Sequence, residues 1–372
     1  MTKEQLLPVI YRVMDKLMNL GGTDWVYDKT MTEEQIETGL FARDFGIEEW
    51  EWPQGVGLYG LYKLQKYYGD DRYVPFFDNW IRKNLEKGLP PKNVNTTMPF
   101  LVVASLLDRL NNPEYEQLCL EHAEWVMHGL PKTKEGGFQH TVTNVHDTAT
   151  SRLNEGQVWA DTLFMTVLFL NKMGHLYDRK DWIDEATRQV LLHIKYLYDK
   201  KTCLLHHAWS FVENGNFGEV FWCRGNSWFT YGIMDYLEMA RDTLDAGVFT
   251  YIADTYRAQC EALRALQAPS GLWHTVLTDP TSYEETSGSG AIVGGMLKGI
   301  RMGILDESFK ECTERGLAGI CSKVAEDGTV LGVSAGTTVG YDADHYRNII
   351  VRPMAYGQSL ALVALVEALG EA

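Results

Sequence analysis

One acidic side chain, Asp161, lies in a segment that otherwise has the spacing of a buried helix. The segment "NEGQVWADTLFMT" covers residues 154–166, and Trp159 stands two positions before the acid. An acid in the first turn of a helix is stabilised by the positive end of the helix dipole. A carboxyl group beside an aromatic ring in a water-poor pocket also has its pKa raised. Such an acid can donate a proton and later take one back. The residues alone leave both interpretations open.

Aromatic residues are numerous and often lie outside regular helical stripes. They make up 12% of the chain, with 11 Trp and 19 Tyr, and many stand in polar, Gly-containing segments such as "EWEWPQGVGLYG", "HHAWSF" and "FWCRGNSWFTYG". Tryptophan commonly fills the core of a large domain. Rings that cluster in loops, however, suit a pocket for sugars, whose one face is apolar and whose rim carries hydroxyl groups.

Two neighbouring histidines, His206 and His207, raise the question of a metal. No third histidine or carboxylate recurs at ligand spacing, so we expect no metal site and no cofactor. The nearby acids Glu48, Glu49 and Glu51 are expected to be solvated, while Glu284, Glu285 and Ser287 are expected to cap a helix.

The composition excludes several classes of protein. The net charge is −16 and no run of Lys or Arg occurs, which argues against binding to nucleic acid or to an anionic membrane. Residues 1–20 have the pattern of an amphipathic helix, unlike a signal peptide or a transmembrane span. The six cysteines show no C-x-x-C pair, and we expect reduced thiols and a cytoplasmic location.

Helical periodicity dominates the chain. Twelve helices are expected near 3–20, 54–68, 73–87, 97–110, 113–128, 157–174, 180–198, 225–241, 247–268, 288–303, 306–324 and 355–371. Helices with one charged face alternate with helices rich in Gly, Ala and aromatic residues, and a helix with little charge is buried on most sides. Strand-like alternation is limited to short pieces such as "GTVLGVSAG". The pattern predicts an all-α protein in which residues 1–372 form one domain, a double ring of six inner and six outer helices.

The expected inner helices share one more feature. Each of the six follows an irregular segment: "EEWEWPQ", "KNVNTT", "SRLNEGQ", "EVFWCRGN", "SYEETSGS" and "RNIIVRPMAYGQ". In a closed ring these segments emerge at the same end. Residues far apart in the sequence would then meet at one mouth, and Asp161 belongs to this set.

Five blocks in order resemble a known family. They are "GGFQHTVT…QVWADTLFMTVLFLNKMG", "KYLYDKKTCLLHHAWSF", "FWCRGNSWFTYGIMDYLE", "LQAPSGLWHTVLTDPTSYEETSGSG" and "VSAGTTVGYDADHYRNIIVRPMAYGQSLAL". Together they resemble the unsaturated glucuronyl and galacturonyl hydrolases of glycoside hydrolase family 105, over about residues 35–370. The resemblance implies an (α/α)6 barrel. It also implies that the protein removes the terminal 4,5-unsaturated uronic acid that lyases leave on pectin (rhamnogalacturonan) fragments, so that its partner is a small unsaturated oligosaccharide.

The resemblance also implies roles for single residues. Asp161 of the Trp-x-Asp motif matches the general acid/base. The substrate-binding residues it suggests, together with neighbouring aromatic candidates, are Trp159, Asn95, His207, Trp209, Trp222, Arg224, Asn226 and Trp228. Arg224 would hold the uronate carboxylate with its guanidinium fork, and a structural ion pair is the alternative. Relatives carry a second acid on an earlier inner helix, where Asn95 is the nearest counterpart.

Two other functions remain open from the sequence. One is the related family 88 activity on glycosaminoglycan fragments, for which sulphated substrates would call for more basic residues at the mouth. The other is an inert oligosaccharide-binding barrel, against which the presence of Asp161 argues. The sequence does not give the sugar to which the uronic acid is attached, the linkage between them, or the oligomeric state.

Overall fold

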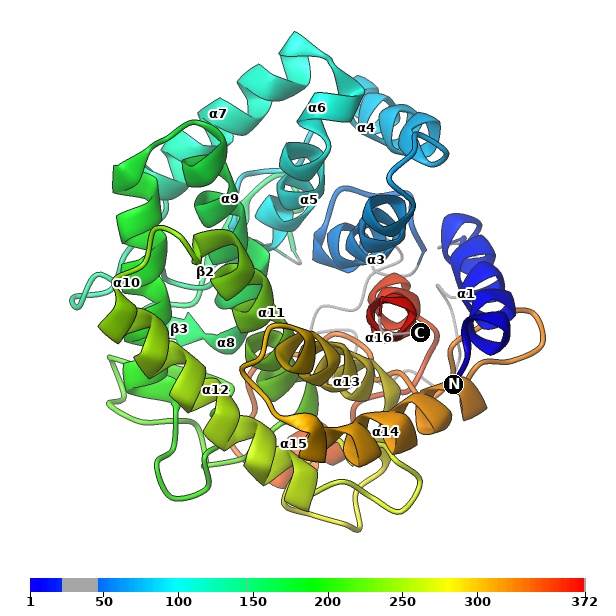
Figure 1. Ribbon diagram of the computed structural model, residues 1–372. Coiled ribbons are helices and arrows are strands. Elements are labelled where there is room, and N and C mark those ends of the chain that lie inside the picture. Colours follow the sequence, from blue (N-terminus) through cyan, green and yellow to red (C-terminus); the bar gives the residue numbers. More distant parts are fainter. Residues whose placement is uncertain (22–45, 145, 371–372) are drawn as a thin grey trace.

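The computed structural model describes residues 1–21, 46–144 and 146–370, and within them the predicted double ring of helices is confirmed (Figure 1). The inner helices are α3 (Trp52–Tyr68), α5 (Val94–Ser105), the continuous run α8 (Ala160–Thr162), η3 (Leu163–Val167) and α9 (Leu168–Leu176), α11 (Cys223–Ala240), α13 (Thr286–Arg301) and α16 (Ala355–Leu369). Each packs on the next, and α16 returns to pack on α3, which closes the ring. The chain thus folds as an (α/α)6 barrel.

An outer layer of amphipathic helices covers this ring. It consists of α1 (Lys3–Met18), α4 (Val74–Lys87), α7 (Pro113–His128), α10 (Lys180–Leu197), α12 (Ala246–Ala265) and α14 (Lys310–Ser322). Three shorter elements are α6 (Leu107–Leu110), η4 (Glu307–Phe309) and α15 (Ala343–Arg347). The predicted alternation of buried and covering helices is therefore correct, because every residue of α16 is buried whereas α10 buries only one side.

Small residues allow the inner helices to approach closely. A Cβ added to Gly290 of α13 would lie 2.5 Å from the carbonyl oxygen of Leu360 on α16. At Gly60 of α3 a Cβ would lie equally close to Oγ of Ser359, which accepts a hydrogen bond of 2.9 Å from the Gly60 N–H. The glycines that made these segments unusual in the sequence are needed for packing of backbone against backbone.

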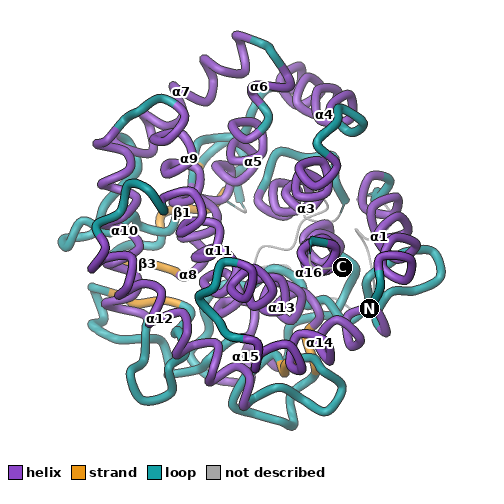
Figure 2. The backbone as a smooth tube through the Cα atoms, viewed as in Figure 1, coloured by secondary structure: helices purple, strands orange, loops and turns teal. Residues whose placement is uncertain are grey.

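The strands are short and stand at the rim (Figure 2). Three antiparallel pairs join β1 (Thr141–Thr143) to β2 (Ser151–Leu153), β3 (Gln157–Trp159) to β4 (Ala208–Ser210), and β5 (Trp273–His274) to β6 (Glu284–Glu285). Residues 157–159, predicted as the start of a helix, are therefore a strand. The expected strand "GTVLGVSAG" contributes only isolated bridges, Val324 with Val330 and Ser334 with Val351.

The two ends of the barrel differ in character. At one end the starts of the inner helices meet, as predicted: Trp52, the first residue of α3, stacks on Tyr356 at the start of α16, with ring centroids 4.6 Å apart. Toward the other ends of these helices, Asp235 of α11 accepts hydrogen bonds from Lys63 of α3, at 2.8 Å, and from Lys298 of α13. Burial alone would raise the pKa of Asp235, but the two ammonium groups outweigh it and hold that pKa well below its usual range. Aromatic side chains thus lie at one end of the barrel, and a buried charge network joins three inner helices toward the other end.

Candidate active site

Asp161 lies at the aromatic end of the barrel, in the first turn of an inner helix. Its side chain is 16% exposed, and its Oδ1 accepts a hydrogen bond of 3.1 Å from the indole N–H of Trp228 on α11. The helix continues directly into the π-helical turn η3. Single π turns inside α-helices are frequent at functional sites. The predicted general acid/base is thus held by a side chain from a neighbouring inner helix, and its own side chain remains only partly exposed.

The β3–β4 pair brings His207 to this carboxylate. Trp159 pairs with Ala208, and the Ala160 N–H donates a hydrogen bond of 2.9 Å to the carbonyl oxygen of His207. This register places Nε2 of His207 3.2 Å from Oδ2 of Asp161. The two atoms are not aligned as a hydrogen bond, and neither has another hydrogen-bond partner among the described residues. Two polar atoms with unused hydrogen-bonding capacity therefore face each other at the mouth.

The charge state of Asp161 differs from the sequence prediction. Burial raises the pKa of this carboxyl, as expected beside Trp159, but the neighbouring His207, His140 and Arg224 outweigh burial and leave the pKa below its usual value. The prediction of a raised pKa is therefore wrong for the free protein. The sequence could not show it, because His140 and His207 reach Asp161 only through the β-strand pairings.

Aromatic rings and a second histidine form the wall beside Asp161. The imidazole of His140 stacks on Trp159, with centroids 4.0 Å apart and planes 5° apart, and His207 meets Trp159 edge-on at 5.2 Å. Trp222 lies 4.4 Å from His207. Burial lowers the pKa of His140 to about 3, so that this ring is neutral. His140 was not singled out from the sequence, although it stands in the quoted block "GGFQHTVT".

Arg224 is placed differently from an open fork for a carboxylate. It is fully buried, and its guanidinium donates hydrogen bonds to the carbonyl oxygens of Ser334, at 2.9 Å, and Ala335, at 2.6 Å. Glu285, which caps α13 as predicted, lies 3.7 Å away. The guanidinium also lies over the ring of Trp222, 4.5 Å from its centroid. The geometry of the free protein therefore matches the ion-pair alternative to direct contact with the substrate.

The side chains of Asn226 and Trp209 also point away from Asp161. The buried amide of Asn226 accepts from the Leu205 N–H at 2.7 Å and donates to the Leu205 carbonyl at 2.9 Å, which fixes the segment leading to His207. Trp209 pairs with Val158 in the strand register, so it lies on the opposite face of the ribbon from Trp159 and packs on Tyr196 of α10. In the free protein both residues therefore stabilise the backbone around His207 and do not face Asp161.

Asn95 stands in the first turn of α5, half-buried, and its side chain makes no hydrogen bond within the described residues. A carboxylate nearby was missed: Glu51, predicted to be solvated, is 3% exposed, caps α3, and accepts a hydrogen bond of 2.6 Å from Thr143. Its position as a helix cap two residues before Pro53 was the available signal.

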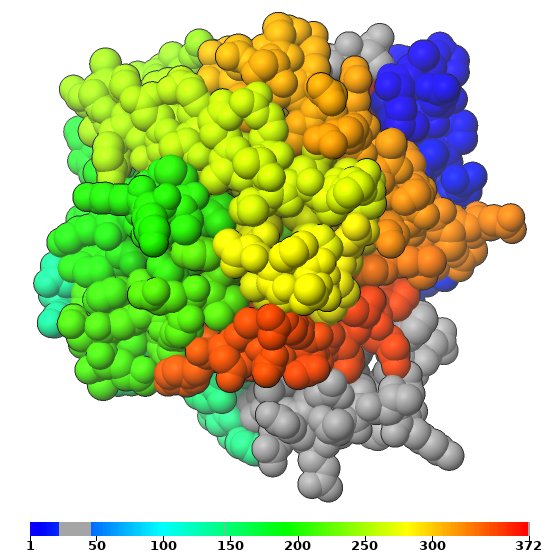
Figure 3. All heavy atoms as spheres, turned by 90° about the horizontal axis from the view of Figure 1, so that it is seen from below, coloured from blue at the N-terminus to red at the C-terminus, as the bar shows by residue number. Residues whose placement is uncertain are grey.

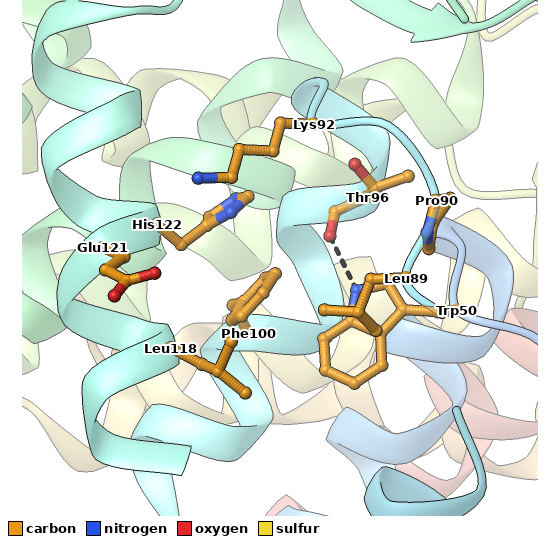
Figure 4. Close-up of a pocket in the computed structure, with 9 residues that line it drawn as sticks. All are labelled: Trp50, Leu89, Pro90, Lys92, Thr96, Phe100, Leu118, Glu121 and His122. Atoms are coloured by element: carbon orange, nitrogen blue, oxygen red, sulfur yellow. Dashed lines mark hydrogen bonds between the residues drawn. The ribbon is translucent and has the colours of Figure 1, made fainter. Parts of the chain in front are cut away.

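Trp50 lines a separate pocket of about 80 Å³ between α5 and α7, where its indole N–H donates to the Thr96 carbonyl (Figure 4). None of the predicted site residues lines this pocket. Trp52, by contrast, lies at the mouth, 6.3 Å from Trp228. The structure thus brings Asp161, Trp159, His207, Trp222 and Trp228 together.

The described residues contain no group of three or more His, Cys, Asp or Glu side chains that could hold a metal ion. Within the same part of the chain, no helix is both long enough and apolar enough to cross a bilayer.

The fold and the acid at its mouth define a helical-barrel protein of the glycoside hydrolase type. The model of the family described as glycosyl hydrolase family 88 matches residues 24–371, so the chain belongs to this family and is a glycoside hydrolase. It is 33% identical to the unsaturated rhamnogalacturonyl hydrolase YesR of Bacillus subtilis (strain 168) over 341 residues, 91% of this chain and 94% of that protein.

Solved structures agree with this assignment. A protein of Klebsiella pneumoniae subsp. pneumoniae MGH 78578, described as a possible member of the GH105 family, is 35% identical with a TM-score of 0.88, covering 100% of this chain and 94% of that one. The predicted resemblance to family 105 is confirmed. The unsaturated glucuronyl hydrolase of Bacillus sp. GL1, at 16% identity and a TM-score of 0.68 over 98% of this chain and 94% of that one, shares the fold.

The surroundings of Arg224 generate a first prediction. In Arg224→Lys, a single ammonium group cannot donate to Ser334 and Ala335 as the planar fork does, so the free energy of unfolding should fall by about 1–3 kcal/mol. KM should hardly change. Urea unfolding and steady-state kinetics test this, with Arg264→Lys on the outer helix α12 as a control expected to lose little stability. A large rise in KM at unchanged stability would instead show that Arg224 binds substrate directly.

Proposed function

We propose that this hydrolase removes a terminal 4,5-unsaturated uronic acid from lyase-generated pectin (rhamnogalacturonan) oligosaccharides by adding water to the C4–C5 double bond. The observation that carries the proposal is the pair of atoms at the mouth, Oδ2 of Asp161 and Nε2 of His207, which lie 3.2 Å apart and have no other hydrogen-bond partner among the described residues. The name of the relative in Bacillus subtilis, an unsaturated rhamnogalacturonyl hydrolase, supports the substrate class.

One carboxyl group suffices for this reaction. The C4–C5 double bond is conjugated to the uronate carboxylate and joined to the ring oxygen, so the sugar is a vinyl ether. Protonation at C4 by Asp161 makes C5 oxocarbenium-like, and water, deprotonated by the same carboxylate, adds at C5. The hemiketal so formed opens and releases the remaining sugar. Ordinary glycosidases, in contrast, need two carboxyl groups beside the anomeric carbon.

The acid must carry a proton when the substrate is in place. In the free protein its histidine neighbours and Arg224 keep the pKa of Asp161 below its usual value. The substrate brings a carboxylate of its own, and a second negative charge nearby in a water-poor site raises the pKa of a carboxyl group. We propose that Asp161 takes up its proton as the substrate binds, so that the substrate prepares its own acid.

The flat rings beside the acid suit a sugar. Trp159 and Trp222 both lie beside His207, at 5.2 and 4.4 Å between ring centroids. Aromatic faces bind the apolar side of a sugar ring, while polar atoms at the edge bind its hydroxyl groups.

We further propose that residues 1–372 form one catalytic domain and that it works in the cytoplasm, to which the six unpaired cysteines are suited.

Asp161→Asn tests the assignment of the acid. The side chains have the same shape, so the fold should survive, but an amide neither donates nor abstracts the required proton. We expect kcat on the preferred unsaturated oligosaccharide to fall by about 10²–10⁴-fold. Asp245→Asn, at the exposed cap of α12, is the matched control and should retain full activity. Near wild-type turnover by Asp161→Asn would refute the assignment.

The destination of the solvent oxygen tests the reaction type. In ¹⁸O-labelled water the label should appear at C5 of the released keto-uronate, and in deuterated water deuterium should appear at C4, as mass spectrometry and NMR would show. A saturated uronide with the same linkage should not react, because it has no double bond to protonate. Cleavage of that saturated analogue at a comparable rate, with oxygen on the anomeric carbon, would mean that Asp161 acts as an ordinary glycosidase acid.

A further inference from the structure

Tyr346 contacts His207 on the side of the imidazole away from Asp161. It belongs to α15, which lies at one end of the barrel, beside the loop between α12 and α13 (Figure 3). The residue is 1% exposed, and its ring lies 5.7 Å from that of Trp222. Its hydroxyl oxygen is 2.9 Å from Nδ1 of His207. The phenol is thus buried against the side of the imidazole that faces away from Asp161.

The protons around this hydroxyl can be assigned from its neighbours. The backbone N–H of Gly340 donates a hydrogen bond of 3.1 Å to the Tyr346 oxygen. Burial raises the pKa of Tyr346 far above its usual value, so the phenol keeps its proton. A neutral hydroxyl has one proton to donate. Because Gly340 has only a proton to give, Nδ1 of His207 is the acceptor within reach among the described residues.

From this geometry we infer that Tyr346 is a positioning residue, which donates to Nδ1 of His207 and so fixes the ring proton on Nε2, toward Oδ2 of Asp161. The partner of one ring nitrogen determines which tautomer a neutral histidine adopts. If the imidazole becomes charged, Nε2 still carries a proton. The carboxylate of Asp161 therefore faces an N–H group in either state, and this role rests on the function proposed above.

The other charged and titratable groups nearby do not fix the tautomer of His207 as the Tyr346 hydroxyl does. His140 and Arg224 also lower the pKa of Asp161, and the loss of the Tyr346 hydroxyl leaves both side chains in place. On the tyrosine side, His345 meets the ring at 5.0 Å, and the Tyr283 hydroxyl donates to the Tyr346 carbonyl oxygen at 3.4 Å. Without the hydroxyl, Nδ1 loses its donor, the other tautomer becomes accessible, and a lone pair at Nε2 can then face the carboxylate. The pKa of Asp161 should rise as a result.

Two measurements test the inference. In the wild-type protein labelled with ¹⁵N-histidine, the imidazole of His207 should show a protonated Nε2 and an unprotonated Nδ1. In Tyr346→Phe the limb of the kcat/KM profile that reports Asp161 should move to higher pH by about one unit, which corresponds to a tenfold change in its proton affinity. Tyr236→Phe is the matched control. That buried hydroxyl interacts with Thr187, 2.8 Å away on an outer helix, and its loss should leave both readouts unchanged.

The outcomes separate this inference from the proposed function. A wild-type His207 protonated on Nδ1 overturns it even if Tyr346→Phe fails to fold. A folded Tyr346→Phe with an unmoved pH limb and an unchanged His207 tautomer also overturns it. Retained activity of Asp161→Asn would refute the catalytic role of the acid, but it would leave the tautomer measurement, which needs no substrate, as a valid test of the contact.

Discussion

The pairing of residues 157–159 with 208–210 is the constraint on which the site depends. It is the register of this three-residue ribbon, with Trp159 opposite Ala208, that brings Nε2 of His207 to 3.2 Å from the carboxylate of Asp161. A shift by one residue would turn every side chain of the ribbon to the other face. Asn226 fixes the segment just before the second strand through both of its amide atoms. The inner helices supply the acid, and the ribbon supplies the group that controls it.

Opposing effects on one carboxyl group connect the fold to the chemistry. The barrel buries Asp161, which favours the neutral acid, whereas His207, His140 and Arg224 favour the ionised base. A residue that must first donate a proton and then accept one from water needs both forms within reach. We propose that the bound substrate carboxylate favours the neutral acid for the first proton transfer, and that Asp161 becomes the base once its proton has passed to C4. Tyr346 acts on Asp161 through His207, by keeping an N–H group of the imidazole directed at the carboxylate.

The sequence predicted the helical ring and the acid well, because both depend on long or local patterns. Periodicity over many residues located the helices, and the Trp-x-Asp motif located Asp161. The β3–β4 ribbon was not predictable, since three residues a strand carry no periodic signal. For the same reason the lowered pKa of Asp161, the burial of Arg224 against Ser334 and the contact of Tyr346 with a residue 139 positions away could not be foreseen. Each depends on loops that meet only after the barrel has closed.

The uptake of a proton on binding tests most directly the claim that the substrate prepares its own acid. A saturated uronide of the same linkage, which should bind without reacting, can be titrated calorimetrically in buffers of different ionisation enthalpy at several pH values. We predict that the wild-type protein takes up a proton on binding, that affinity increases as the pH falls, and that the uptake disappears in Asp161→Asn. Equal proton uptake by the two proteins, or binding to the wild type with no uptake at any pH, would contradict the account.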